Sequence, residues 1–226
     1  AEYYEAKATG KKNFAYLPMT IHHYEKCHNL VKVYQYKIAY LKEYYTIVNE
    51  NFPVLHWEME YGDDNQELSF QADEILRLAE EVIRFEGDSH QLQEMKMEMY
   101  YVKGRFDIAI GEYETGLANI KASEAIAETL NDNKARLNNY KQMIFYGIQI
   151  ENLLLVKKYV KEGMKLIDET DTDEKGIFMR LKGWYLLHEG RYEEARALLT
   201  QAREFFENRD GGSGQYAMNI AACYNY

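Results

Sequence analysis

Apolar residues recur at every third or fourth position over most of this chain, which is the spacing of side chains on one face of an α-helix. Such a face is clear between Glu67 and Phe85, where it comprises Phe70, Ile75, Leu78, Ala79 and Val82. Further helices are predicted over residues 20–51, 92–102, 106–119, 122–130, 134–149, 153–169, 173–188, 192–207 and from 214 onward. Both prolines lie in the first quarter of the chain, so none interrupts the later helices. The pattern predicts an all-α protein.

The first quarter of the chain is organised less regularly than the rest. A short helix followed by a loop is predicted within residues 1–16. The helix over 20–51 has one apolar stripe that begins at Leu30 and a second stripe, of tyrosines, beside it. A helix that is apolar on two sides packs against neighbours on both. A break near His28 would divide this long segment into two helices.

Small residues mark the places where two predicted helices come close. Gly183 lets a neighbouring helix approach, and Gly190 supplies a tight turn because glycine adopts positive φ without steric cost. Ala195 and Ala202 lie seven residues apart on one face of the following helix and leave room for the first helix. Gly147 precedes Gly183 by 36 residues. This spacing indicates a repeated unit of helix, turn and helix.

A related run lies upstream, from Lys103 to Ala109, and it places Gly104 at the position of the turn. Gly104 and Gly190 are 86 residues apart, which is no multiple of a period of ~34 residues. An insertion is therefore predicted within residues 118–133. The residues expected to pack the repeats together are Gly104, Ala109, Gly147, Gly183, Gly190, Ala195 and Ala202.

Over about half of the chain, these residues and spacings resemble the tetratricopeptide repeat family. The resemblance implies a right-handed superhelical solenoid of antiparallel helix pairs, in which the first helix of each pair lines a groove for an extended peptide or a partner helix. We predict an irregular helical part over 1–66 and repeats over 67–226, cut within the last helix. The aromatic residues expected at the groove are Tyr100, Tyr101, Tyr146, Trp184 and Tyr185.

The resemblance also implies the function. A repeat array of this kind is a non-enzymatic module that binds a protein or a peptide. The layout is similar to the repeat segments of bacterial multidomain transcriptional regulators, so we expect the interaction or sensor region of a larger regulatory protein. An alternative is the peptide-sensing domain of a quorum-type transcriptional regulator. No motif specifies the partner or the oligomeric state.

Charge and composition exclude several classes of protein. The formal net charge is −10, from 27 Lys and Arg against 37 Asp and Glu, and this charge repels nucleic acid. No apolar run approaches the ~20 residues of a membrane span, and the chain does not start with a signal-peptide pattern. The two cysteines, Cys27 and Cys223, are predicted to be reduced thiols in a cytoplasmic protein.

Candidate chemistry is sparse. His22, His23 and Cys27 are the densest group of possible metal ligands, and they support a metal-dependent enzyme as a further alternative. No CxxC or HExxH motif supplies the remaining ligands, so surface or packing histidines are the favoured interpretation. The glycine-rich loop from Asp210 to Gly214 precedes a helix but lacks the lysine of a phosphate-binding loop. We predict no catalytic residue, metal or cofactor.

Overall fold

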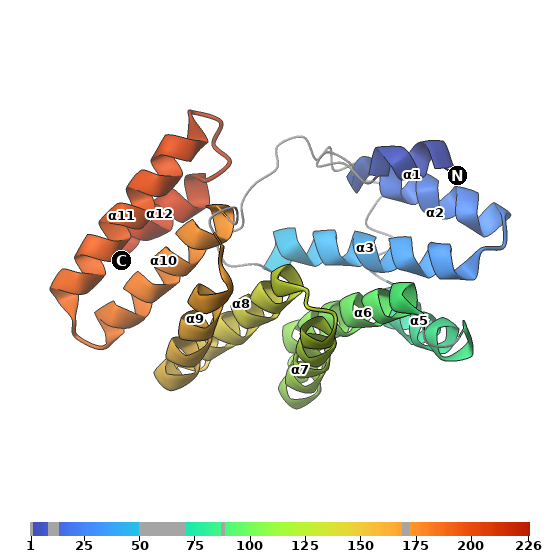
Figure 1. Ribbon diagram of the computed structural model, residues 1–226, viewed down its shortest axis with the longest axis horizontal. Helices are drawn as coiled ribbons and strands as arrows, with labels where there is room; N and C mark the ends of the chain where they lie inside the picture. Colours follow the sequence, from blue (N-terminus) through green and yellow to red (C-terminus); the bar gives the residue numbers. More distant parts are fainter. Residues whose placement is uncertain (1, 9–13, 50–70, 87–88, 169–171) are drawn as a thin grey trace. The chain divides into compact units, whose positions relative to one another are not determined.

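The computed structural model describes residues 2–8, 14–49, 71–86, 89–168 and 172–226 (Figure 1). All regular structure in these ranges is helical, with no strand, so the all-α prediction is confirmed. The chain forms two compact units that meet in sequence between Leu130 and Asn131, and each is described by itself. The predicted boundary at residues 66–67 lies outside the described residues.

The first unit is built around one long helix. This helix, α3, packs against α2, α5 and α6, so it is covered on more than one side as its two apolar stripes predict. Its side chains Ile38, Tyr40 and Leu41 are buried. A break separates α2 from α3 at residues 27–29, where His28 has a φ of 53°. The elements of this unit are α1 (Glu2–Ala8), η1 (Phe14–Tyr16), α2 (Leu17–Lys26), α3 (Leu30–Asn49), α5 (Ala72–Glu86), α6 (His90–Ala109) and α7 (Tyr113–Thr129).

The second unit consists of two antiparallel helix pairs and a final short helix (Figure 1). Helix α8 packs against α9, α9 against α10, α10 against α11, and α11 against α12. Lys141 Nζ of α8 lies 2.9 Å from Glu174 Oε1 of α10, and this ion pair is largely buried. The elements are α8 (Asn133–Gln149), α9 (Leu153–Leu166), α10 (Thr172–His188), α11 (Tyr192–Asp210) and α12 (Ala217–Asn225).

Three helix pairs share one type of connection, which also joins α2 to α3 at His28 and α7 to α8 at Asn131. The turns between α6 and α7, α8 and α9, and α10 and α11 each have three residues, and the middle residue has a positive φ. These residues are Gly111 with a φ of 92°, Glu151 with 57° and Gly190 with 76°. The first two are 40 residues apart and the last two are 39 apart. The predicted turn at Gly104 is wrong, because this glycine lies within α6 and the chain turns seven residues later.

Burial repeats with the same interval. Relative to the positive-φ residue of each turn, nine positions are buried in all three pairs. Four of these positions carry a small or aliphatic residue in every pair. One of these four positions lies seven residues before the turn (Gly104, Ile144, Gly183). The other three lie five residues after the turn (Gly116, Val156, Ala195), nine residues after it (Ile120, Val160, Leu199) and twelve residues after it (Ser123, Gly163, Ala202). The three pairs therefore share one pattern of burial at intervals of 39–40 residues.

The glycines at these positions allow close contact. A Cβ added at Gly104 would lie 2.8 Å from the backbone O of Gly116, and one added at Gly183 would lie 2.6 Å from Cγ of Leu199. At Gly147 the added Cβ would lie 2.9 Å from Val156, so this glycine also packs closely, although the counterpart of Gly183 in its pair is Ile144.

Two predictions about the packing of the repeats need correction. Ala109 is exposed, because it is the last residue of α6 and precedes the turn. The predicted insertion within 118–133 is absent, since α7 runs unbroken to Thr129. Both errors follow from placing the turn at Gly104, which shifted the following helix by seven residues.

Candidate functional site

The five aromatic residues predicted to line a groove are divided between the two units. Tyr100 and Tyr101 lie on α6 in the first unit, and Tyr146, Trp184 and Tyr185 lie on α8 and α10 in the second. Tyr101 and Tyr185 are buried, with exposed fractions of 6% and 3%, so nearly all of their surface packs against the protein. The other three are half-buried and present part of their rings to solvent.

Trp184 and Tyr185 are neighbours on α10 with different surroundings. The indole ring of Trp184 lies against the imidazole of His188, with 4.0 Å between ring centroids. Lys157 Nζ of α9 lies 5.9 Å from the centroid of the Tyr185 ring, and burial raises the pKa of this tyrosine. Tyr185 therefore helps to join α9 to α10, whereas Trp184 is only half-buried.

Apolar side chains that sequence reasoning missed are exposed at the turns of the helix pairs. In the second unit they include Leu154 and Tyr192, with exposed fractions of 80% and 66%. An ion pair between Lys157 of α9 and Glu189 of the α10–α11 turn holds these two turn regions together. Tyr113 of the first unit occupies the same position as Tyr192, two residues after the glycine of its turn. This recurrence was the sequence signal that could have revealed them.

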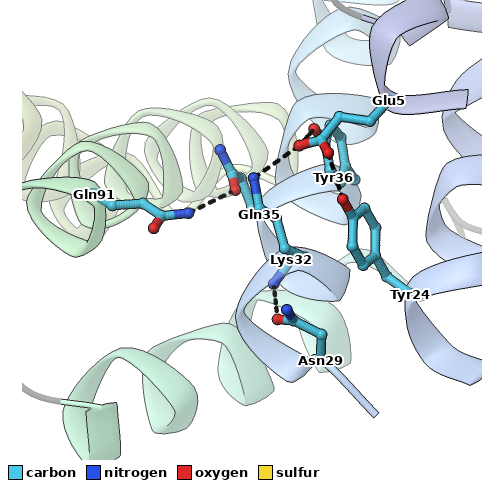
Figure 2. A network of polar contacts seen from close by, with 7 residues as sticks. All are labelled: Glu5, Tyr24, Asn29, Lys32, Gln35, Tyr36 and Gln91. Atoms are coloured by element: carbon cyan, nitrogen blue, oxygen red, sulfur yellow. Dashed lines mark hydrogen bonds and ion pairs between the residues drawn. The ribbon is translucent and has the colours of Figure 1, made fainter. Parts of the chain in front are cut away.

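A cluster of polar side chains joins α1 to α2 and α3 in the first unit (Figure 2). The carboxylate of Glu5 accepts a hydrogen bond of 2.8 Å from Lys32 Nζ and one of 2.6 Å from the hydroxyl of Tyr36. The hydroxyl of Tyr24 donates a third, short hydrogen bond to the other carboxylate oxygen. The rings of the two tyrosines stack, with centroids 5.8 Å apart and planes inclined by 9°.

These contacts fix the charge states of the cluster. Hydrogen bonds from Lys32, Tyr24 and Tyr36, in that order, lower the pKa of Glu5 from 4.5 to about 2. Burial, followed by the hydrogen bond to Glu5, raises the pKa of Tyr24 from 10.0 to about 12. The pKa of Tyr36 is raised for the same two reasons. At neutral pH the cluster is one carboxylate held by two neutral phenols and an ammonium group.

A polar hollow of about 320 Å³ lies next to this cluster, between the first turns of α3 and α6. The side chains of Asn29 and Ser89 cap the two helices by accepting hydrogen bonds from backbone N–H groups. Gln91 Nε2 donates a hydrogen bond of 3.2 Å to Gln35 Oε1 and links α6 to α3 (Figure 2). The residues around the hollow are Asn29, Val31, Lys32, Ser89, Gln91 and Leu92.

The glycine-rich loop after α11 already holds an anion, the carboxylate of Asp210. Its Oδ2 accepts a hydrogen bond of 2.9 Å from the N–H of Gly214, and its Oδ1 accepts one of 2.8 Å from the N–H of Tyr216. These backbone hydrogen bonds lower the pKa of Asp210. The two amides that could have held a phosphate therefore bind a side chain of the same loop.

The histidines of α2 take part in ring contacts. His23 stacks on Tyr4 of α1 with 4.9 Å between centroids, and its ring lies 5.8 Å from that of His22. Cys27 lies beyond the last residue of α2 and is exposed. In the part of the chain that the structure describes, no three His, Cys, Asp or Glu side chains are grouped so that they could hold a metal ion. Among the same residues, no helix has the length and apolar character needed to cross a membrane.

No protein-family model, no curated protein and no solved structure matches this chain.

Proposed function

We propose that this chain is a non-enzymatic helical-repeat module that binds a protein or a peptide. The observation that carries the proposal is the recurrence of nine buried positions around a positive-φ turn in three helix pairs, at intervals of 40 and 39 residues. One such pair cannot bury its apolar faces alone, and stacked pairs create extended surfaces that bind partners. The chain is then a cytoplasmic repeat array of the tetratricopeptide type. Its repeat of 39–40 residues is longer than the ~34-residue repeat of that family.

The proposed contact surface of the second unit is formed by the first helices of its two pairs, α8 and α10. The buried ion pair between Lys141 and Glu174 connects these two helices. Tyr146 and Trp184 lie on them and are only half-buried, which leaves ring surface for a partner. Aromatic side chains of this kind commonly supply most of the affinity of a protein interface.

The acidic charge of the chain is unevenly distributed. Residues 43–130 contain 20 acidic and six basic residues, a formal charge of −14, whereas residues 131–226 contain 14 of each and are neutral. A basic partner would be steered toward the first of these segments. Contacts with Trp184 would then be mainly apolar. In this proposal the module is the interaction or sensor region of a larger bacterial regulatory protein, and the alternative is the peptide-sensing domain of a quorum-type transcriptional regulator.

The proposal can be tested without knowing the partner, by selecting binders from a library of random peptides. The purified chain is immobilised and exposed to a library of 12-residue peptides displayed on phage, and enriched peptides are synthesised and titrated by calorimetry. We expect one family of related peptides, whose affinity falls at least about tenfold, or ~1.4 kcal/mol, in the Trp184→Ala variant. Circular dichroism verifies that the variant keeps its helices.

Tyr224→Ala provides the matched control, because Tyr224 is an exposed aromatic residue of the same unit on α12. Its replacement should leave the affinity unchanged. Selection of no peptide family, or equal affinities for the native chain and for Trp184→Ala, would refute the proposed contact surface.

A further inference from the structure

Helix α1 packs on α2 and η1 without burying any of its own residues. It has seven residues. Glu5 makes the three hydrogen bonds described above, and Tyr4 stacks on His23. A helix of this length is unstable by itself in water, so α1 depends on these contacts for its structure.

The three groups that hold Glu5 are arranged by the rest of the unit. Tyr24 belongs to α2, whereas Lys32 and Tyr36 belong to α3, and the two tyrosine side chains are buried. Their stacked rings are fixed by the packing of α2 against α3 and not by α1. Two hydroxyl groups and one ammonium group thus converge on one point, and such a set of donors binds a carboxylate strongly.

The segment of sequence that carries the three donors has a formal charge opposite to that of the whole chain, and two of its lysines, Lys37 and Lys42, are paired with Glu25 and Glu98. Residues 17–42 contain four lysines and one glutamate, a formal charge of +3, in a chain with a charge of −10. Attraction between this segment and an acidic ligand would add to the three hydrogen bonds. An acidic segment is therefore the partner that fits the surface chemically, and α1 shows how such a segment binds.

We propose that Tyr24, Lys32 and Tyr36 form a carboxylate-binding site that α1 occupies as an internal ligand, and that an acidic peptide segment of another protein displaces α1 by inserting its own glutamate. This extends the proposed binding function to a second surface and does not involve Trp184. Because α1 competes for the site, the apparent affinity for the external peptide equals its affinity for an empty site multiplied by the fraction of sites that α1 leaves free. If the site is free in about one molecule in ten, the external peptide binds about tenfold more weakly than to an empty site.

The test uses the full chain and a synthetic peptide with the sequence of residues 1–8. Binding is followed by chemical shifts of backbone amides in the ¹⁵N-labelled chain, which detect millimolar affinities. In the Glu5→Gln chain the internal ligand is weakened, so the peptide should saturate residues near Lys32 at a concentration at least about tenfold lower than in the native chain. A peptide in which glutamine replaces its own second glutamate should not saturate either chain.

Two further variants locate the site. Tyr36→Phe in the Glu5→Gln chain removes one donor and keeps the stacked ring, and it should weaken the peptide at least about fivefold. Tyr34→Phe, on the same helix and outside the cluster, should have no effect. Trp184→Ala should also have no effect, which separates this site from the surface proposed above. Equal affinities for the native and Glu5→Gln chains, or an affinity unaffected by Tyr36→Phe, would overturn the proposal and leave α1 as a purely structural helix.

Discussion

Replacing Gly104 with alanine adds one methyl group where the backbones of α6 and α7 touch. The added Cβ would lie 2.8 Å from the backbone O of Gly116 and 2.8 Å from two atoms of Ile120, against 3.4–4 Å for ordinary contact. No side-chain rotation can move the oxygen, so the helices must separate by about 0.6 Å, which weakens the dispersion contacts of their neighbours. Overpacking of this kind costs ~1–3 kcal/mol, and the higher helix propensity of alanine returns ~1 kcal/mol. We expect a net loss of up to ~2 kcal/mol.

The assay is urea unfolding followed by circular dichroism. With a slope of ~2 kcal/mol/M, the midpoint for Gly104→Ala should fall by up to about 1 M. Ala118→Gly, at an exposed position of α7, measures helix propensity alone and should cost ~1 kcal/mol. If Gly104→Ala instead raised the stability by about the amount that Ala118→Gly lowers it, the close contact between α6 and α7 would be refuted.

The remaining predictions concern titration, capping and thiol reactivity. Because the pKa of Glu5 is 4.5 when free and about 2 when bound, the attachment of α1 is stable above pH 4.5 and should be lost as the pH falls toward 2, as measured by hydrogen exchange of α1 amides. Tyr24, with a pKa of about 12, should ionise well above the ordinary value of 10.0 in an absorbance titration, and the cluster should loosen over that range. Asp210→Ala should lower the midpoint of unfolding in urea, since two backbone N–H groups lose their acceptor. At pH 8 a thiol reagent should modify the exposed Cys27 rapidly and Cys223 only after unfolding, because burial raises the pKa of the Cys223 thiol to about 11.

The helices after residue 131 could be predicted closely from the sequence. Their predicted bounds agree with α8, α10 and the start of α11 to within one residue. Local signals explain this success, since Asp132 and Asn152 cap α8 and α9 and Gly190 turns the chain between α10 and α11. Such signals involve residues that are three or four positions apart, so they can be recognised from the sequence alone.

The errors between residues 92 and 130 have a different cause. A glycine can turn the chain or can admit a neighbouring backbone, and the sequence of α6 does not distinguish these two roles. Gly104 has the second role and Gly111 the first, as the contact with Gly116 and the φ of 92° show. Glu151 adopts a positive φ without being glycine, which concealed the middle repeat and its interval of 40 residues.

The cluster at Glu5 could not be predicted from sequence patterns. Its carboxylate meets Tyr24, Lys32 and Tyr36, which lie 19, 27 and 31 residues further along the chain. No periodicity connects these positions, because the contact depends on the break at His28 that folds α2 against α3. Of the predicted groove residues, the sequence could identify the helices that carry them but not which rings are buried, as the difference between Trp184 and Tyr185 illustrates.

Hydrogen exchange in the presence of a peptide selected from the random library tests most directly whether the repeated helix pairs form a binding surface. Bound peptide should slow exchange in the first helices of the second unit, over residues 140–148 and 176–188, and this protection should disappear in the Trp184→Ala variant. Protection confined to α9 and α11, or exchange that is unchanged by saturating peptide, would contradict the account.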